Sequence, residues 1–152
     1  SYKQIASLPE PVKQLTSIAN LVSKVTKLYP EDTVEMIMVD DVNLSVDVVQ
    51  LEQVLINLVK NGVEAINNAG VSGKVSISWQ QIGKNFKLVI VDDGTGVSNP
   101  DNLFVPFYTT KAKGSGIGLV LCRQIIEAHG GKLSLANRNE AKGCIAVIEL
   151  SL

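Results

Sequence analysis

The segment from Asp47 to about Asn67 constrains the fold of this chain most, because its residues repeat at the period of an α-helix. Asp47 is a plausible N-cap at its start. On a helical wheel, one polar stripe lies within roughly 40° of Asn57: Gln53, Asn61, Glu64 and Asn68. The opposite arc is apolar: Leu51, Val54, Leu55, Leu58, Ala65 and Ile66. The pattern predicts a long amphipathic helix whose apolar side faces a sheet.

The remaining periodic segments indicate the sheet and two more helices. Residues 15–28 have helical spacing, and a helix over 119–129 should end at Gly130-Gly131. Strand-like runs cover 34–39, 74–80, 86–91, 132–136 and 144–150, with 82–85 as a hairpin connection and 93–118 as a loop. The order is α-β-α-ββ-loop-α-ββ. Paired strands favour an α+β fold, a two-layer α/β sandwich with a mixed, mostly antiparallel sheet packed against three helices.

The composition describes one globular domain. The chain has 152 residues, of which 45% are hydrophobic and 19% charged. A net charge of −1 gives no reason to expect binding to nucleic acid or to an anionic membrane. Cys122 and Cys144 form no CxxC pattern, so we expect two buried free thiols in a reducing compartment, which predicts a cytoplasmic location.

The polar stripe has two interpretations. Asn57 and Asn61, at positions i and i+4, offer amide oxygens on one face, which suits a hard cation such as Mg²⁺. Asparagine is also a poor helix former, which is unusual for a solvated face. An ordinary solvated face nevertheless remains the alternative, and the stripe alone does not decide between them.

Two glycine-rich segments are further candidates. Asp92-Asp93-Gly94-Thr95-Gly96 follows a strand, so it is either a plain turn or a place where a carboxylate meets a hydrogen-bond donor of a ligand. The segment 114–119 (GSGIGL) opens a helix, where backbone N–H groups favour phosphate, and Lys111 with Thr109 and Thr110 would add donors. Its spacing is neither the Rossmann fingerprint nor a Walker P-loop, and a flexible hinge is the alternative. His129, the only histidine, is expected to cap a helix C-terminus as a partly positive group.

Taken in order, these segments resemble the ATP-binding catalytic domain of sensor histidine kinases, in the gyrase–Hsp90–histidine kinase–MutL superfamily with its Bergerat fold. QVLINLVKNGVEA (53–65) is similar to the N-box and VDDGTGV (91–97) to the G1 box. LFVPFYTTK (103–111) is similar to the F-box and GSGIGL (114–119) to the G2 box. The resemblance runs from about Asp47 to Leu150. One departure is Gly62, where alanine is common, and glycine there should loosen the helix by about 1 kcal/mol.

The resemblance implies a role for each box. Asn57, Asn61 and Lys111 would be catalytic, with Asn61 as the Mg²⁺ ligand and Lys111 neutralising phosphate charge. Asp92 would hold the adenine amino group. The full set of implied nucleotide contacts is Asn57, Asn61, Glu64, Asp92, Gly94, Gly96, Val97, Phe107, Thr109, Thr110, Lys111, Gly114, Ser115, Gly116, Ile117, Gly118 and Leu119.

The implied activity is transfer of the γ-phosphoryl group of ATP, bound with Mg²⁺, to a histidine on a dimerisation domain, for relay to an aspartate of a response regulator receiver domain. Nothing in the chain resembles the phosphoaccepting histidine box, since Gly130-Gly131 follows His129. We therefore expect residues 1–14 to be a joint after dimerisation helices, similar to nitrogen-regulation-type kinases, and 15–152 to be the ATP-binding domain. The isolated fragment, a monomer that does not bind membranes, should bind ATP without phosphorylating itself. Membrane anchoring of the parent protein is left open.

Three other functions compete with this one. A serine-kinase anti-sigma factor shares the fold and boxes, but the F-box and the SLPEP segment before the first helix favour a histidine kinase. An ATP-driven switch like Hsp90 or MutL would carry a glutamate four residues before the metal-binding asparagine, where this chain has Asn57, so ATP hydrolysis should be poor. The last alternative is a degenerate interaction domain that binds no nucleotide.

Overall fold

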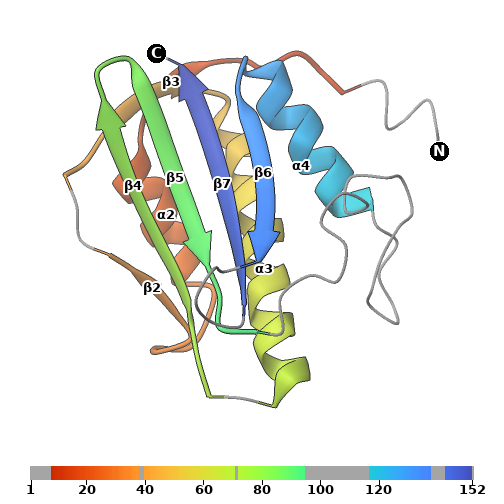
Figure 1. Ribbon diagram of the computed structural model, residues 1–152. Coiled ribbons are helices and arrows are strands. Elements are labelled where there is room, and N and C mark those ends of the chain that lie inside the picture. Colours follow the sequence, from red (N-terminus) through yellow and green to blue (C-terminus); the bar gives the residue numbers. More distant parts are fainter. Residues whose placement is uncertain (1–7, 38–39, 71, 95–116, 138–142, 152) are drawn as a thin grey trace.

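A five-stranded sheet forms one layer of the computed structural model, which describes residues 8–37, 40–70, 72–94, 117–137 and 143–151 (Figure 1). The strands are, in spatial order, β2 (Val34–Met36), β4 (Val75–Ile82), β5 (Asn85–Val91), β7 (Cys144–Ser151) and β6 (Lys132–Asn137). β2 runs parallel to β4, and every other neighbouring pair is antiparallel. A separate antiparallel pair joins β1 (Gln14–Ser17) to β3 (Asn43–Val46).

The described residues form three helices, which lie on one face of the five-stranded sheet: α2 (Ile18–Thr26), α3 (Val48–Ala69) and α4 (Ile117–Ala128) (Figure 1). Alternate strand residues point toward them and are buried, as Phe86, Leu88 and Ile90 do on β5. This alternation is expected where one face of a sheet meets the core and the other meets solvent. The predicted α/β sandwich with a mixed, mostly antiparallel sheet is therefore confirmed. None of these helices is both long and apolar enough to cross a membrane.

The first helix begins later than predicted. The sequence pattern started it at Leu15, but residues 14–17 pair with β3 and α2 starts at Ile18. Ser17 caps the helix by accepting a hydrogen bond from the Asn20 backbone N–H at 3.1 Å. The Asp41 carboxylate accepts a second from the Ala19 N–H at 2.9 Å. A carboxylate at this position satisfies a free donor of the first turn and complements the helix dipole. A residue distant in sequence thus fixes where α2 begins.

The long helix α3 has the predicted N-cap. Asp47 accepts a hydrogen bond from the Gln50 backbone N–H at 3.0 Å through one carboxylate oxygen. Its other oxygen accepts the Val12 backbone N–H at 2.9 Å, so the cap also fastens the segment before β1. The helix ends at Ala69, two residues beyond the predicted end, because Gly70 takes the left-handed conformation (φ 65°) of a C-terminal stop.

β4, β5, β6 and β7 match the predicted runs within two residues, whereas β2 ends at Met36, before the end of the predicted run 34–39. The β4–β5 connection is shorter than predicted, since Ile82 pairs with Asn85 and only Gly83 and Lys84 lie between the strands. Gly83 has φ 60°, which a tight turn between twisted strands requires. The pair β1–β3 was not predicted, because strands of four residues carry too little periodicity to be recognised.

Candidate functional site

The carboxyl-terminal half of α3 packs against the strand ends through two glycines. Gly62 is buried in the helix, and a Cβ there would lie 2.9 Å from Val75 Cγ2 and 3.2 Å from Asp92 Cβ. A Cβ on Gly94 would lie 2.6 Å from Ala65 Cβ. Both glycines therefore allow the helix backbone to approach the end of β5 closely. The prediction that Gly62 merely loosens the helix was incomplete, since the missing side chain makes room for Val75 and Asp92.

Asp92 is a buried charged residue, with 7% of its surface exposed. Its Oδ1 accepts hydrogen bonds from the backbone N–H groups of Gly94 at 2.8 Å and Cys144 at 3.3 Å. Its own N–H donates to the Cys144 carbonyl at 3.0 Å. A buried carboxylate needs such donors, because desolvation without them costs several kcal/mol. The turn after β5 and the start of β7 thus hold this carboxylate in one place beside α3. Sequence reasoning identified Asp92 but missed Cys144, whose contribution comes from its backbone.

The Asn57 side chain, on α3, lies beside the start of α4. Its Oδ1 is 3.8 Å from the position of a Cβ on Gly118, so the N-box stripe and the last glycine of the GSGIGL segment face each other. Asn57 also contacts Cys122. Burial raises the pKa of the Cys122 thiol to about 12, although the hydrogen bond with Asn57 acts in the opposite direction. Two motifs separated by sixty residues in sequence therefore come together at one helix crossing, that of α3 and α4.

Glu64, on the same stripe, lies near Tyr29. Burial raises the pKa of the Tyr29 hydroxyl, and the negative charge of Glu64 raises it further. Asn61 and Glu64 are both half-buried on α3. In sequence they lie between Asn57, which faces Gly118, and Ala65, which contacts Gly94. Their predicted roles toward a metal and a nucleotide stay predictions.

Several predicted contacts lie outside the described residues, as does most of the predicted loop over 93–118: Gly96, Val97, Phe107, Thr109, Thr110, Lys111, Gly114, Ser115 and Gly116. Ile117 is the first residue of α4. Gly118 is exposed, and Leu119 is half-buried against the core. The two cysteines are buried free thiols, as expected.

His129 caps α4, as predicted. Its Nδ1 donates to the Ile125 carbonyl at 2.8 Å, and its Nε2 accepts the Asp47 backbone N–H at 3.0 Å. With the ring proton on Nδ1, the imidazole makes both bonds at once. His129 therefore ties the end of α4 to the start of α3.

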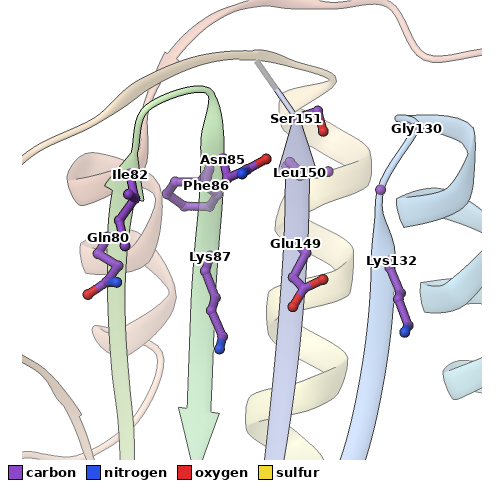
Figure 2. A pocket seen from close by; sticks show the side chains of 11 residues that line it. Gln80, Ile82, Asn85, Phe86, Lys87, Gly130, Lys132, Glu149, Leu150 and Ser151 are labelled. Carbon is purple, nitrogen blue, oxygen red and sulfur yellow. The ribbon is translucent and has the colours of Figure 1, made fainter.

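A hollow of about 520 Å³ lies at the opposite end of β5 from Asp92 (Figure 2). One polar row crosses four neighbouring strands beside it: Gln80, Lys87, Glu149 and Lys132. None of these residues belongs to the glycine-rich segments or to the polar stripe of α3. The hollow is therefore separate from the candidate site around Asp92.

Comparisons with known proteins agree with this geometry. Residues 46–152 match the family described as histidine kinase-, DNA gyrase B-, and HSP90-like ATPase. The chain is 40% identical over 97 residues to the sensor protein TdiS of Thauera aromatica, covering 60% of this chain and 18% of TdiS. It is 28% identical over 161 residues to the nitrogen regulation protein NtrY of Azorhizobium caulinodans, covering 99% of this chain and 21% of NtrY. The chain thus spans only a small part of each of these relatives.

Solved structures give the same answer. The catalytic domain of the histidine kinase ThkA superimposes with a TM-score of 0.76 at 30% identity, covering 91% of this chain and 95% of that domain. ThkA in complex with the response regulator TrrA superimposes with a TM-score of 0.72 at 27% identity, covering 91% of this chain and 41% of that one. The chain therefore belongs to the histidine kinase-, DNA gyrase B-, and HSP90-like ATPases, and within them it is a domain of the type found as the catalytic domain of sensor histidine kinases.

Proposed function

We propose that this domain binds ATP with Mg²⁺ and supplies the γ-phosphoryl group to a histidine on a separate dimerisation domain, for relay to a response regulator aspartate. The observation that carries the proposal is the meeting of three motifs along α3. The Asn57 side chain faces Gly118 at the start of α4. On the next turns of α3, Gly62 approaches Asp92 and Ala65 approaches Gly94. These are segments for which the sequence predicts contacts to phosphate, metal and base.

The chemistry of the residues fits a purine nucleotide. Asp92 is a fixed, buried acceptor, and the amino group of adenine is a donor that complements it. The amide oxygens of Asn57 and Asn61 are hard ligands on the same helix, and Asn61 would hold Mg²⁺. Gly118 and Leu119, at the start of α4, would present backbone N–H groups to phosphate. Glu64, Gly94 and Ile117, with the predicted residues from Gly96 to Gly116, would complete the contacts.

Phosphoryl transfer mainly requires positioning and charge neutralisation by the protein. When bound, ATP would supply the transferable phosphoryl group, and Mg²⁺ would supply most of the positive charge that neutralises the phosphates. Asn61 would orient the metal, Asn57 would orient a phosphate, and Lys111 would neutralise charge on the phosphates. Asp92 would fix the base, so that the opposite end of the nucleotide is always presented in the same orientation.

Transfer to a histidine is favoured over ATP hydrolysis. In the Hsp90- and MutL-like switches a glutamate activates water, and this chain has Asn57 at that position. An amide is not a general base, so attack by water should be slow. A receiver domain is the proposed partner because the structurally similar ThkA has been seen with a response regulator. We expect the domain to act in the cytoplasm, where ATP is available.

Thermal unfolding with added nucleotide tests this proposal. A nucleotide at 100 times its dissociation constant should add about 2.7 kcal/mol of stability. For a domain of this size that corresponds to a rise in Tm of roughly 5 to 11 °C. The rise should depend on Mg²⁺ for ATP, and Asn61→Ala should remove that dependence, whereas Asp92→Asn should abolish the rise for ADP as well. A folded wild-type chain whose Tm does not respond to ATP or ADP would refute the proposal.

Phosphotransfer is the second step of the test. The domain with ATP and Mg²⁺ should phosphorylate a supplied dimerisation domain that bears a histidine, and the product should be acid-labile. The domain alone should stay unphosphorylated. Acid-labile phosphate on the isolated domain would contradict the assignment of the acceptor to another domain.

A further inference from the structure

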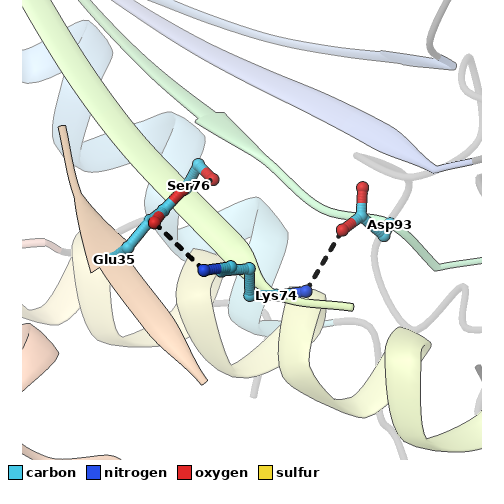
Figure 3. Close-up of polar contacts among 4 residues, drawn as sticks. All are labelled: Glu35, Lys74, Ser76 and Asp93. Atoms are coloured by element: carbon cyan, nitrogen blue, oxygen red, sulfur yellow. Dashed lines mark hydrogen bonds and ion pairs between the residues drawn. The ribbon is translucent and has the colours of Figure 1, made fainter. Parts of the chain in front are cut away.

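Asp93, the residue after the buried Asp92, connects the end of β5 to the start of β4. Its Oδ2 accepts a hydrogen bond from the Lys74 backbone N–H at 3.1 Å (Figure 3). Lys74 directly precedes β4, at the end of the connection from α3. The bond therefore fastens the connection that follows α3 to the turn that carries Asp92.

Gly73 makes this contact possible. A Cβ on Gly73 would lie 2.7 Å from Asp93 Cβ and 2.9 Å from its Oδ2, both shorter than real contacts of this kind. Gly73 does not have a positive φ, so its backbone conformation is open to any residue. Glycine is needed here because Asp93 occupies the space where a side chain would be.

The Lys74 side chain extends the connection to the edge of the sheet. Its Nζ lies 3.3 Å from Glu35 Oε2 on β2, and Ser76 Oγ donates to Glu35 Oε1 at 3.0 Å (Figure 3). The Lys74 and Glu35 side chains are 42% and 45% exposed, so their ion pair contributes little to stability. The Lys74 ammonium, Glu35 and Ser76 belong to the same polar network, but within the described part of the chain these side chains make no hydrogen bond with the turn 92–94. A substitution among them therefore provides a matched control.

We propose that Asp93 is a positioning residue for the nucleotide, an inference that rests on the proposed role of Asp92 toward adenine. Three contacts among the described residues hold the turn 92–94. Cys144 N–H binds Asp92, Gly94 packs on Ala65 of α3, and Lys74 N–H binds Asp93. Removing the Asp93 carboxyl frees one of the three, so the Asp92 carboxyl is no longer held where the base must meet it.

The test compares affinity for ADP, by isothermal titration calorimetry, with Tm for the same variants. Asp93→Ala should weaken ADP binding about ten-fold, because a hydrogen bond to a charged group is lost at the turn. Asp93→Asn should stay within about two-fold of wild type, since an amide oxygen can still accept from Lys74 N–H. Ser76→Ala, which removes only the bond to Glu35, should also stay within about two-fold.

Each outcome has one meaning. A folded Asp93→Ala with wild-type affinity for ADP overturns the positioning role, even if its Tm falls, because only a structural role then remains. Equal loss in Asp93→Asn and Asp93→Ala also overturns it, since charge rather than position would then matter. If Asp93→Ala does not fold, Gly73→Ala decides, because its Cβ should displace Asp93 and weaken binding, and unchanged affinity refutes the inference. If wild type binds no ADP, the proposed function itself has failed.

Discussion

Gly62→Ala sets two opposing effects against each other inside α3. Alanine in a helix interior is more favourable than glycine by about 1 kcal/mol. The new Cβ, however, would lie 2.9 Å from Val75 Cγ2. Val75 is fully buried, and a β-branched side chain is stiff at χ1, so it cannot rotate away without strain. Overpacking of this kind typically costs about 1 to 3 kcal/mol. The net expectation is destabilisation by about 1 kcal/mol, a fall in Tm of roughly 2 to 4 °C.

Nucleotide affinity should respond to the same change. The second neighbour of the new Cβ is Asp92 Cβ at 3.2 Å, so either α3 or the Asp92 turn must shift by a few tenths of an ångström. We expect weaker ADP binding, measured by isothermal titration calorimetry alongside urea unfolding of the same samples. The two measurements separate lost stability from lost positioning.

A Val75→Ala background provides the matched control. Val75→Ala alone should cost roughly 1 to 3 kcal/mol, because it opens a cavity under α3. With the Val75 methyls absent, Gly62→Ala should become stabilising, since the helix preference remains and the main clash is gone. The coupling energy of this double-mutant cycle should be about 1 to 2 kcal/mol. If Gly62→Ala alone raised stability by about 1 kcal/mol, the close approach of α3 to Val75 would be wrong.

Three further predictions concern the helix caps and the thiols. Asp47→Ala should cost about 1 to 2 kcal/mol in urea unfolding, because Gln50 N–H and Val12 N–H both lose their acceptor, and a cost near zero would show that water replaces the cap. Hydrogen bonds lower the pKa values of Asp41 and Asp47 in the folded chain, so their contribution is complete at neutral pH and is lost as the pH falls below about 4. Asp41→Asn should therefore shrink the acid-induced fall of the urea midpoint, and an unchanged fall would argue against the α2 cap. Burial raises the thiol pKa to about 12 for Cys122 and about 11 for Cys144, so a disulfide reagent at pH 8 should label both only after unfolding, and rapid labelling of folded protein would contradict their burial.

The local chemistry of the sequence was sufficient for most of the elements. Asp47 and Gly70 bound α3 through contacts within three residues of each end, so the helix could be predicted from the sequence around it. β4, β5, β6 and β7 each extend over six or more residues with a strand-like pattern. This pattern located each strand within about two residues of its observed ends. The glycine-rich segments and the paired asparagines were also visible, and they led to the correct family.

The start of α2 shows where local chemistry is insufficient. Helical spacing extends back to Leu15, but Asp41 supplies an acceptor at Ala19 and β3 pairs with residues 14–17. Both partners are more than twenty residues away in the chain. Their effect on the helix boundary depends on the folded chain bringing them there, which no window of sequence contains.

Sequence by itself therefore determined the long helix, the four longer strands and the family to which the chain belongs, because periodicity, caps and motifs act over a few neighbouring residues. The tertiary structure decided why particular residues are needed. Gly62 looks like a weak point of the long helix, yet it makes room for Val75 and Asp92, and Gly73 makes room for Asp93. His129 looks like a cap for α4 alone, yet it also accepts the Asp47 N–H at the start of α3. Each of these properties depends on two residues that meet only in the folded chain. The space for a side chain, or the hydrogen-bond donor, at one position is set by a residue distant in sequence.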